Sequence, residues 1–184
     1  MQPLLERLMT TFPDAVRGVE VDTARNEITA RVAAARIVDV ARWLHDTPEA
    51  SFDHITDICS VDYPNDPERF EGVYQLLSLA HRRRIRLKAR VTEDAPQIAS
   101  VTGIWKGAEF MEREVYDLMG ITFVGHPDLR RILLPEDYEE GHPLRKDFPT
   151  EGRGWRSSFP FIPRLDEAPV EQTEEEVPER EAEE

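Results

Sequence analysis

The spacing of proline is the sequence feature that most limits how this chain can fold. In the last 50 residues, prolines stand at Pro135, Pro143, Pro149, Pro160, Pro163, Pro169 and Pro178. Because each proline removes a backbone donor and interrupts helices, regular structure is not expected beyond residue 134. We therefore predict that residues 1–134 form the folded domain.

The proline-rich part divides into two segments of different composition. Residues 135–165 contain Trp155, Phe159 and Phe161, which would be a liability if they were exposed in a free coil. We predict an extended arm that lies on a surface, either that of its own domain or that of a partner. In residues 166–184, ten acidic residues against one arginine give −9 of the formal net charge of −14. This composition predicts a disordered acidic tail.

Hydrophobic periodicity predicts the order of the elements before residue 134. Helical spacing marks residues 2–12, 36–46 and 107–119. Strand-like patterns mark residues 19–21, 28–32, 52–61, 72–80 and 83–92, with 23–26 as a hairpin connection. This order predicts an α+β fold, in which a mainly antiparallel sheet of about five strands carries helices on one face. The extended C-terminal arm follows it.

The cysteine count and the hydropathy pattern exclude several classes of protein. A single Cys59 cannot form an internal disulfide or supply a four-cysteine iron–sulfur or zinc site, and we expect it to be a small core residue of a strand. No apolar run reaches the length of about 18 residues that a membrane span needs. Neither a secretory signal nor a glycine-rich phosphate loop is visible. We expect a reduced, cytoplasmic protein.

The helix predicted at 107–119 is the most informative element. Its apolar stripe comprises Phe110, Met111, Val115, Leu118 and Met119. Glu114 lies four residues from two members of this stripe, so we predict a buried carboxylate that needs a cationic partner. The candidates along the chain are Arg130, Arg131 and Arg145. We favour an ion pair that fixes the arm over a proton-handling acid, and we expect Arg113 and Asp117 to pair on another face.

Two further groups of polar residues carry weaker signals. In the strand at 83–92 and just before it, the cations Arg82, Arg84, Arg86, Lys88 and Arg90 alternate with apolar residues. We expect this face to meet acidic neighbouring strands or an acidic partner, and we disfavour nucleic-acid binding because the protein is acidic overall. His126 and His142 lack the spacing of a metal site.

A block in the second half of the chain resembles the signature of a known family. Its first part consists of Glu112, Arg113, Glu114, Asp117, Leu118, Met119, His126, Arg130, Ile132 and Leu133. Its closing part runs from His142 through Pro143, Leu144, Arg145 and Lys146 to Asp147. Both parts resemble the C subunit of the proton-pumping NADH-quinone oxidoreductase, the 30-kilodalton subunit family of respiratory complex I. The matching block covers about a quarter of the chain.

The resemblance implies a non-catalytic subunit of the peripheral arm, with no catalytic residue, cofactor site or metal site of its own. In that family FMN, the iron–sulfur clusters and the quinone belong to partner subunits, and the chief partner is the D subunit, which forms the quinone cavity. The resemblance implies no nucleic-acid partner. It also implies peripheral association with the cytoplasmic face of the bacterial inner membrane, through the complex. The signature residues and the aromatic residues of the arm would then form the partner interface.

Three alternatives remain open. Equivalent subunits serve ferredoxin-dependent plastoquinone reductases and membrane-bound nickel–iron hydrogenases, and the electron donor is chosen by other subunits. A free-standing acidic binding module would use the basic strand face. A small acid–base enzyme built on Glu114 and His142 is the weakest alternative, because no nucleophile or metal motif accompanies these residues.

Overall fold

The computed structural model describes residues 2–22 and 27–154. The helices are α1 (Gln2–Thr11), α2 (Ile37–Asp46) and α3 (Ala108–Met119), with a short 3-10 helix η1 at Ala34–Arg36. The strands are β1 (Val16–Asp22), β2 (Glu27–Val32), β3 (His54–Asp62), β4 (Phe70–Ser78), β5 (Arg83–Val91), β6 (Gln97–Ala99) and β7 (Thr122–Val124). None of the helices in the described part is long and apolar enough to cross a membrane.

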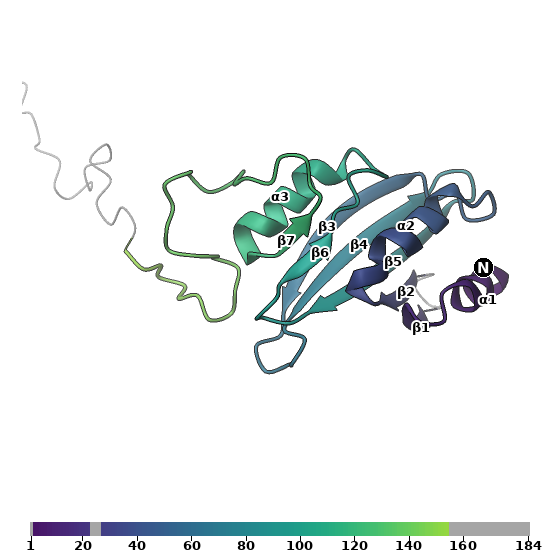
Figure 1. Cartoon of the computed structure of the whole chain (residues 1–184), viewed down its shortest axis with the longest axis horizontal. Helices are drawn as coiled ribbons and strands as arrows, with labels where there is room; N and C mark the ends of the chain where they lie inside the picture. Colours follow the sequence, from purple (N-terminus) through teal and green to yellow (C-terminus); the bar gives the residue numbers. More distant parts are fainter. Residues whose placement is uncertain (1, 23–26, 155–184) are drawn as a thin grey trace, which may run out of the picture. The chain divides into compact units, whose positions relative to one another are not determined.

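The main sheet has five strands in the order β1-β2-β5-β4-β3 (Figure 1). Its β1–β2, β4–β5 and β3–β4 pairs are antiparallel, and its β2–β5 pair is parallel. The predicted α+β fold with a mainly antiparallel sheet is therefore confirmed. The parallel β2–β5 pair and the small parallel sheet of β6 and β7 lie outside the prediction, because pairing between distant strands leaves no local sequence pattern.

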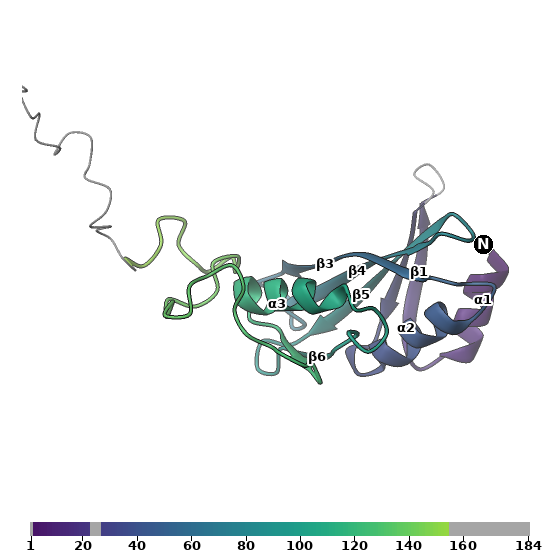
Figure 2. The ribbon, with the colours of Figure 1, turned by 90° about the horizontal axis from the view of Figure 1, so that it is seen from above.

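One face of the main sheet carries the hydrophobic core. In β5 the buried residues are Ile85, Leu87, Ala89 and Val91, and they alternate with more exposed cations. Helix α2 buries Ile37, Val40, Ala41 and Leu44. Figures 1 and 2 show α2 and α3 against the same face of the sheet. The described residues place no helix on the opposite face, which we call the open face.

Cys59 differs from its prediction. It lies in β3, as expected, but its side chain is exposed and does not belong to the core. The neighbouring Ile58 is only 3% exposed and takes the core-facing position. Because consecutive residues of a strand face opposite sides of the sheet, Cys59 points away from the core. The prediction of a core cysteine is therefore wrong.

Residues 135–154 have almost no regular structure but are partly attached to the domain. By their contacts, the described residues up to 153 form one compact unit. Residues 135–153 thus pack with the domain that was predicted to end at 134. Binding of the arm at 135–165 to a partner stays a prediction. Its aromatic residues Trp155, Phe159 and Phe161, the tail at 166–184 and the hairpin connection at 23–26 lie outside the described residues.

Candidate functional site

The buried carboxylates of α3 are not the one predicted. Glu114 is exposed, whereas Glu112 and Asp117 are both 0% exposed. Phe110, which the predicted stripe included, is 59% exposed. The buried side of α3 runs instead through Ala108, Glu112, Val115 and Met119. Because Ala108 is small and Glu112 is polar, this side carries little apolar signal, and the sequence pattern indicated the wrong flank of the helix.

Glu112 is held by neutral donors alone. Its Oε1 accepts a hydrogen bond from the backbone N–H of Val101 at 2.8 Å, and its Oε2 accepts one from Ser100 Oγ at 2.7 Å. Burial raises the pKa of the Glu112 carboxyl, and these two hydrogen bonds only partly oppose that effect. Glu112 thus fastens the middle of α3 to the loop that follows β6, with no cation bonded to it among the described residues.

Asp117 has the opposite environment. Its Oδ2 accepts three successive backbone N–H groups, those of Ile132, Leu133 and Leu134, at 2.8–3.0 Å. Its Oδ1 accepts Arg131 Nη1 at 2.7 Å. Burial alone would raise the pKa of Asp117, but these four donors together lower it. Asp117 therefore binds the segment 131–134 as a fixed anion.

Arg113 also binds this segment, and not Asp117 as predicted. Its guanidinium donates from Nε to the carbonyl of Arg130 at 3.1 Å and from Nη2 to the carbonyl of Arg131 at 2.9 Å. Arg113 is only 6% exposed, so these backbone acceptors satisfy a nearly buried cation. The predicted Arg113–Asp117 pair is wrong because each side chain is engaged by the 130–134 segment.

The closing part of the signature binds the C-terminal end of α3. His142 Nδ1 donates a hydrogen bond to the carbonyl of Asp117 at 2.9 Å. The backbone N–H of Leu144 donates to the carbonyl of Leu118 at 3.1 Å. Arg145 Nε donates to the carbonyl of Met119 at 2.8 Å. The last carbonyls of a helix lack partners within it and favour a nearby cation, so residues 142–145 act as a cap. Pro143 lies half-buried within this cap.

The cap requires Gly120 at the end of α3 and leaves the side chain of His142 half-buried. Gly120 ends α3 at a φ of 76°, in the left-handed region. A Cβ atom there would lie 2.5 Å from Arg145 Nη2 and from His142 Nε2. Burial lowers the pKa of His142, although its bond to the Asp117 carbonyl opposes that shift. Both geometry and backbone conformation therefore exclude a side chain at position 120.

An ion cluster attaches the end of the signature to the β3–β4 connection. Arg69 donates to both oxygens of Asp62 at 2.8 and 2.9 Å, and to Asp147 at 2.6 Å. The backbone N–H of Lys146 also donates to Asp62, at 2.7 Å. The Asp62 carboxylate is completely buried, and the hydrogen bonds from Arg69 lower its pKa. Asp62 and Arg69 lie between the strands predicted at 52–61 and 72–80, and nothing local to them indicates an ion pair with residue 147.

The two remaining signature residues stabilise a turn. His126 Nδ1 accepts the backbone N–H of Asp128 at 3.0 Å, and its Nε2 donates to the carbonyl of Glu109 at 3.0 Å. Arg130 is exposed and pairs with Asp128 at 2.9 Å. Within residues 2–22 and 27–154, no group of three or more His, Cys, Asp or Glu side chains could hold a metal ion. The arrangement around α3 fastens segments of the chain together.

The chain is similar to proteins of one family over most of its length. Residues 30–154 match the family described as "Respiratory-chain NADH dehydrogenase, 30 Kd subunit". The chain is 50% identical over 146 residues to the C subunit of NADH-quinone oxidoreductase from Roseiflexus sp. (strain RS-1). This match covers 79% of this chain and 82% of that relative. It is 50% identical over 152 residues to the protein of the same name from Xanthobacter autotrophicus, with coverages of 83% and 71%.

Two solved structures share the fold. The trypsin-resistant fragment (1-134) of Nqo5 has a TM-score of 0.58 at 31% identity and covers 70% of this chain and 98% of the fragment. A chain of the membrane-bound sulfane sulfur reductase, an archaeal respiratory membrane complex, has a TM-score of 0.69 at 26% identity, with coverages of 81% and 85%. These similarities confirm the resemblance carried by the signature, and the chain belongs to the 30-kilodalton subunit family of the respiratory-chain NADH dehydrogenase.

Proposed function

We propose that the chain is a non-catalytic subunit of the peripheral arm of a proton-translocating NADH:quinone oxidoreductase. It supports electron transfer from NADH to quinone by holding the quinone-site module together, with the D subunit of the complex as its main partner. The relatives named as C subunits of NADH-quinone oxidoreductase support this role. The signature residues also support this role. Those with hydrogen bonds in the described structure each fasten a backbone segment or a turn.

The observation that carries this proposal is a set of exposed apolar side chains on and around α3, three of which belong to the signature. Eight large hydrophobic side chains are exposed in the described part of the chain. Five of them belong to α3, β7 or the segments bonded to α3, namely Phe110, Val124, Ile132, Leu133 and Leu144. We call these five residues the apolar surface. Because exposed apolar patches on a folded domain mark interaction sites, this surface is the proposed contact with the partner subunit.

The cofactors and the cellular location follow from the assembly. FMN, the iron–sulfur clusters and the quinone are proposed to reside in partner subunits, since one exposed cysteine supplies a single thiolate and a cluster requires several. The chain would reach the cytoplasmic face of the bacterial inner membrane through the complex. Trp155, Phe159 and Phe161 would extend the partner interface beyond the described residues.

The experiment compares two substitutions of exposed apolar side chains. Phe110→Asp places a charge in the apolar surface, and Leu79→Asp places the same charge at a position 62% exposed in the β4–β5 connection. Both isolated chains should unfold at the same temperature as the native chain. After affinity purification from gently solubilised membranes, Phe110→Asp should recover far fewer partner subunits than Leu79→Asp.

Mass spectrometry of the native chain's partners tests the family role itself. Recovery of flavin-, cluster- and quinone-site subunits with NADH–quinone activity is the expected result. Recovery of no companion subunit would contradict the proposal and favour a free-standing binding module. Equal recovery with both Asp variants would contradict the assignment of the apolar surface.

A second function is favoured by one comparison. The similarity to a chain of an archaeal membrane-bound sulfane sulfur reductase extends over 81% of this chain. The same fold thus occurs in a respiratory complex with a different name and reaction. Ferredoxin-docking or hydrogenase subunits among the purified partners would keep the assembly role and change the electron donor.

A further inference from the structure

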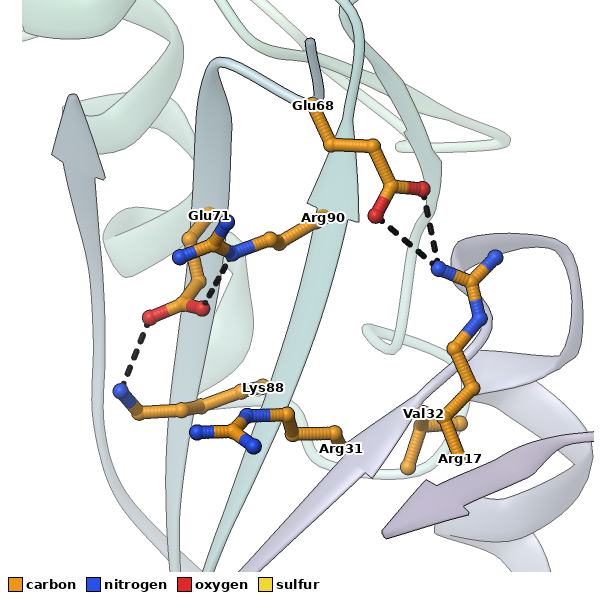
Figure 3. A pocket seen from close by; sticks show the side chains of 7 residues that line it. All are labelled: Arg17, Arg31, Val32, Glu68, Glu71, Lys88 and Arg90. Carbon is orange, nitrogen blue, oxygen red and sulfur yellow. Dashed lines mark hydrogen bonds and ion pairs between the residues drawn. The ribbon is translucent and has the colours of Figure 1, made fainter. Parts of the chain in front are cut away.

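The open face of the main sheet contains a charged hollow of about 300 Å³ (Figure 3). Its charged lining consists of Arg17, Arg31, Lys88, Arg90, Glu68 and Glu71. Val32 is the only apolar side chain in the lining. The cations come from β1, β2 and β5, which are adjacent strands, so the sheet itself fixes their spacing. The apolar surface around α3 contributes none of these residues.

The buried carboxylate of Glu71 holds two of the four cations in place. Glu71 is 1% exposed and accepts Lys88 Nζ and Arg90 Nε, each at 2.9 Å. Arg90 also reaches Asp66 at 2.6 Å. Figure 3 shows that Arg17 reaches Glu68, and this distance is 2.9 Å. These bonds preorganise the cationic groups around the hollow.

Arg31 is the cation that is most available to a new partner. Its one ion pair in the described structure is with Glu20 at 2.7 Å, and both side chains are more than half exposed. Exposed pairs of this kind contribute little stability, so Arg31 can exchange Glu20 for a better placed carboxylate. In Figure 3 its guanidinium lies beside Lys88, within the hollow. The lining has four cations and two carboxylates, and Glu20 and Asp66 beside it pair with Arg31 and Arg90, so a carboxylate that binds Arg31 would replace Glu20.

The chemistry of the lining identifies the kind of occupant. Pockets for small ligands are lined mainly by apolar side chains and start at roughly 300 Å³, so this charged hollow is at the lower limit of their size and differs from them in composition. Charge complementarity instead favours carboxylate side chains. The cationic row continues along the same face to Arg86 and Arg84, and Arg84 has no ion pair among the described residues. A linear acidic segment could follow this row.

We infer that the open face is a second docking surface, on which an acidic segment of another subunit places a carboxylate between Arg31 and Lys88. This inference rests on the proposed function, because it requires that the chain assembles with other subunits. It is separate from the apolar surface in both position and chemistry. Steering by these charges would also make assembly faster at low ionic strength.

The first test reverses or preserves the charge at position 31 in the full chain. Arg31→Glu should lower the affinity for the purified partner subunits about tenfold, as expected when a partly desolvated interfacial ion pair is lost. Arg31→Lys should stay close to the native chain. Arg84→Glu applies the same charge reversal outside the hollow and should have a smaller effect. All three variants should unfold like the native chain, because both arginines are exposed.

The second test identifies the occupant. A photo-crosslinking residue at position 20, beside Arg31, is irradiated in the assembled complex, and the linked peptide is sequenced. An acidic segment of another subunit supports the inference. A non-acidic peptide, no crosslink in a complex that is otherwise complete, or tight binding of inorganic phosphate without a crosslink would each overturn it. In those cases the companion subunits are still recovered, so the proposed function stands. Loss of all companions from the native chain would instead contradict the proposed function.

Discussion

The two buried carboxylates of α3 lie five residues apart and are equally inaccessible, yet the fold treats them in opposite ways. Glu112 receives one backbone N–H and one hydroxyl, and burial raises its pKa. Asp117 receives three backbone N–H groups and a guanidinium, and its pKa is lowered in spite of burial. Burial alone therefore does not set the direction of the pKa shift of a carboxylate here. The number and charge of the donors set it.

The two residues also differ in what they hold. The donors to Glu112 come from the loop just before α3, eleven to twelve residues away. The donors to Asp117 come from the segment after β7, which continues into the cap at the end of α3. The raised pKa thus belongs to a contact within the domain core, and the lowered pKa to the attachment of residues 131–134, which lead into the proline-rich part.

The largest expected effect is that of Asp117→Ala. The change leaves three aligned N–H groups and Arg131 without their acceptor. Removing one partner of a buried charged network costs about 3–5 kcal/mol, and we expect a loss of this size in the free energy of unfolding. Urea unfolding of the isolated chain measures it.

Glu114→Ala is the matched control, since it removes an exposed carboxylate from the same helix. It should change the free energy of unfolding by less than about 0.5 kcal/mol. Equal losses for the two variants would mean that α3 tolerates no change at all, and that the bonds to Asp117 are not the cause.

Gly120→Ala should follow in size. A non-glycine residue at a positive φ costs about 1–2 kcal/mol, and here a Cβ would also press on His142 and Arg145. Gly125→Ala is the control, because Gly125 has a φ of 85° but open space around its Cβ position. Hydrogen exchange at the Leu144 amide should become faster in Gly120→Ala alone. Equal exchange in both variants would show that the contact with the cap is unimportant.

Local sequence patterns predicted the elements well. The predicted helix at 107–119 corresponds to α3 at Ala108–Met119, and the predicted helix at 36–46 to α2 at Ile37–Asp46. The alternation in 83–92 correctly separated the cations of β5 from its aliphatic residues, which the structure buries. These predictions succeeded because period and turn residues are properties of short segments.

The contacts of the site were less predictable, because they join distant segments. Arg69 bonds to Asp147 across 78 residues, and Asp117 bonds to the backbone amides of a segment with no regular structure. Backbone donors leave no trace in residue types. The error at Glu114 has a similar origin, since the buried flank of α3 is marked by a carboxylate that the apolar pattern could not count. The family signature includes Asp117 and Asp147 but does not reveal these contacts.

Glu112→Gln sharpens the comparison through its pH dependence. The amide keeps an acceptor for Val101 and a donor for Ser100, and it removes the cost of burying a charge. We expect the variant to be more stable than the native chain at pH 7 by on the order of 1 kcal/mol. A carboxyl whose pKa is higher in the folded than in the unfolded state contributes its full stabilisation of the fold below its unfolded-state pKa. This contribution is lost as the pH rises through its folded-state pKa. The gain in Glu112→Gln should therefore disappear in acid.

Asp117→Asn is the opposite case. A carboxyl whose pKa is lower in the folded than in the unfolded state contributes its full stabilisation of the fold above its unfolded-state pKa. This contribution is lost as the pH falls through its folded-state pKa. The deficit of Asp117→Asn should be largest at neutral pH and shrink below the ordinary range of an aspartate. Thermal unfolding between pH 3 and pH 8 compares the two variants. Parallel pH profiles would refute the contrast between these carboxylates.

The smallest effect on stability is expected for Arg130→Ala, although Arg130 belongs to the same signature. Its side chain is exposed and pairs only with the exposed Asp128 in the described structure, and such pairs seldom contribute measurably. The thermal midpoint of the isolated chain should stay unchanged within error. If assembly with partner subunits nevertheless falls, Arg130 contacts a partner while Asp117 holds the fold, and the signature unites two separate requirements. A lowered midpoint would instead place Arg130 with the fold-holding residues.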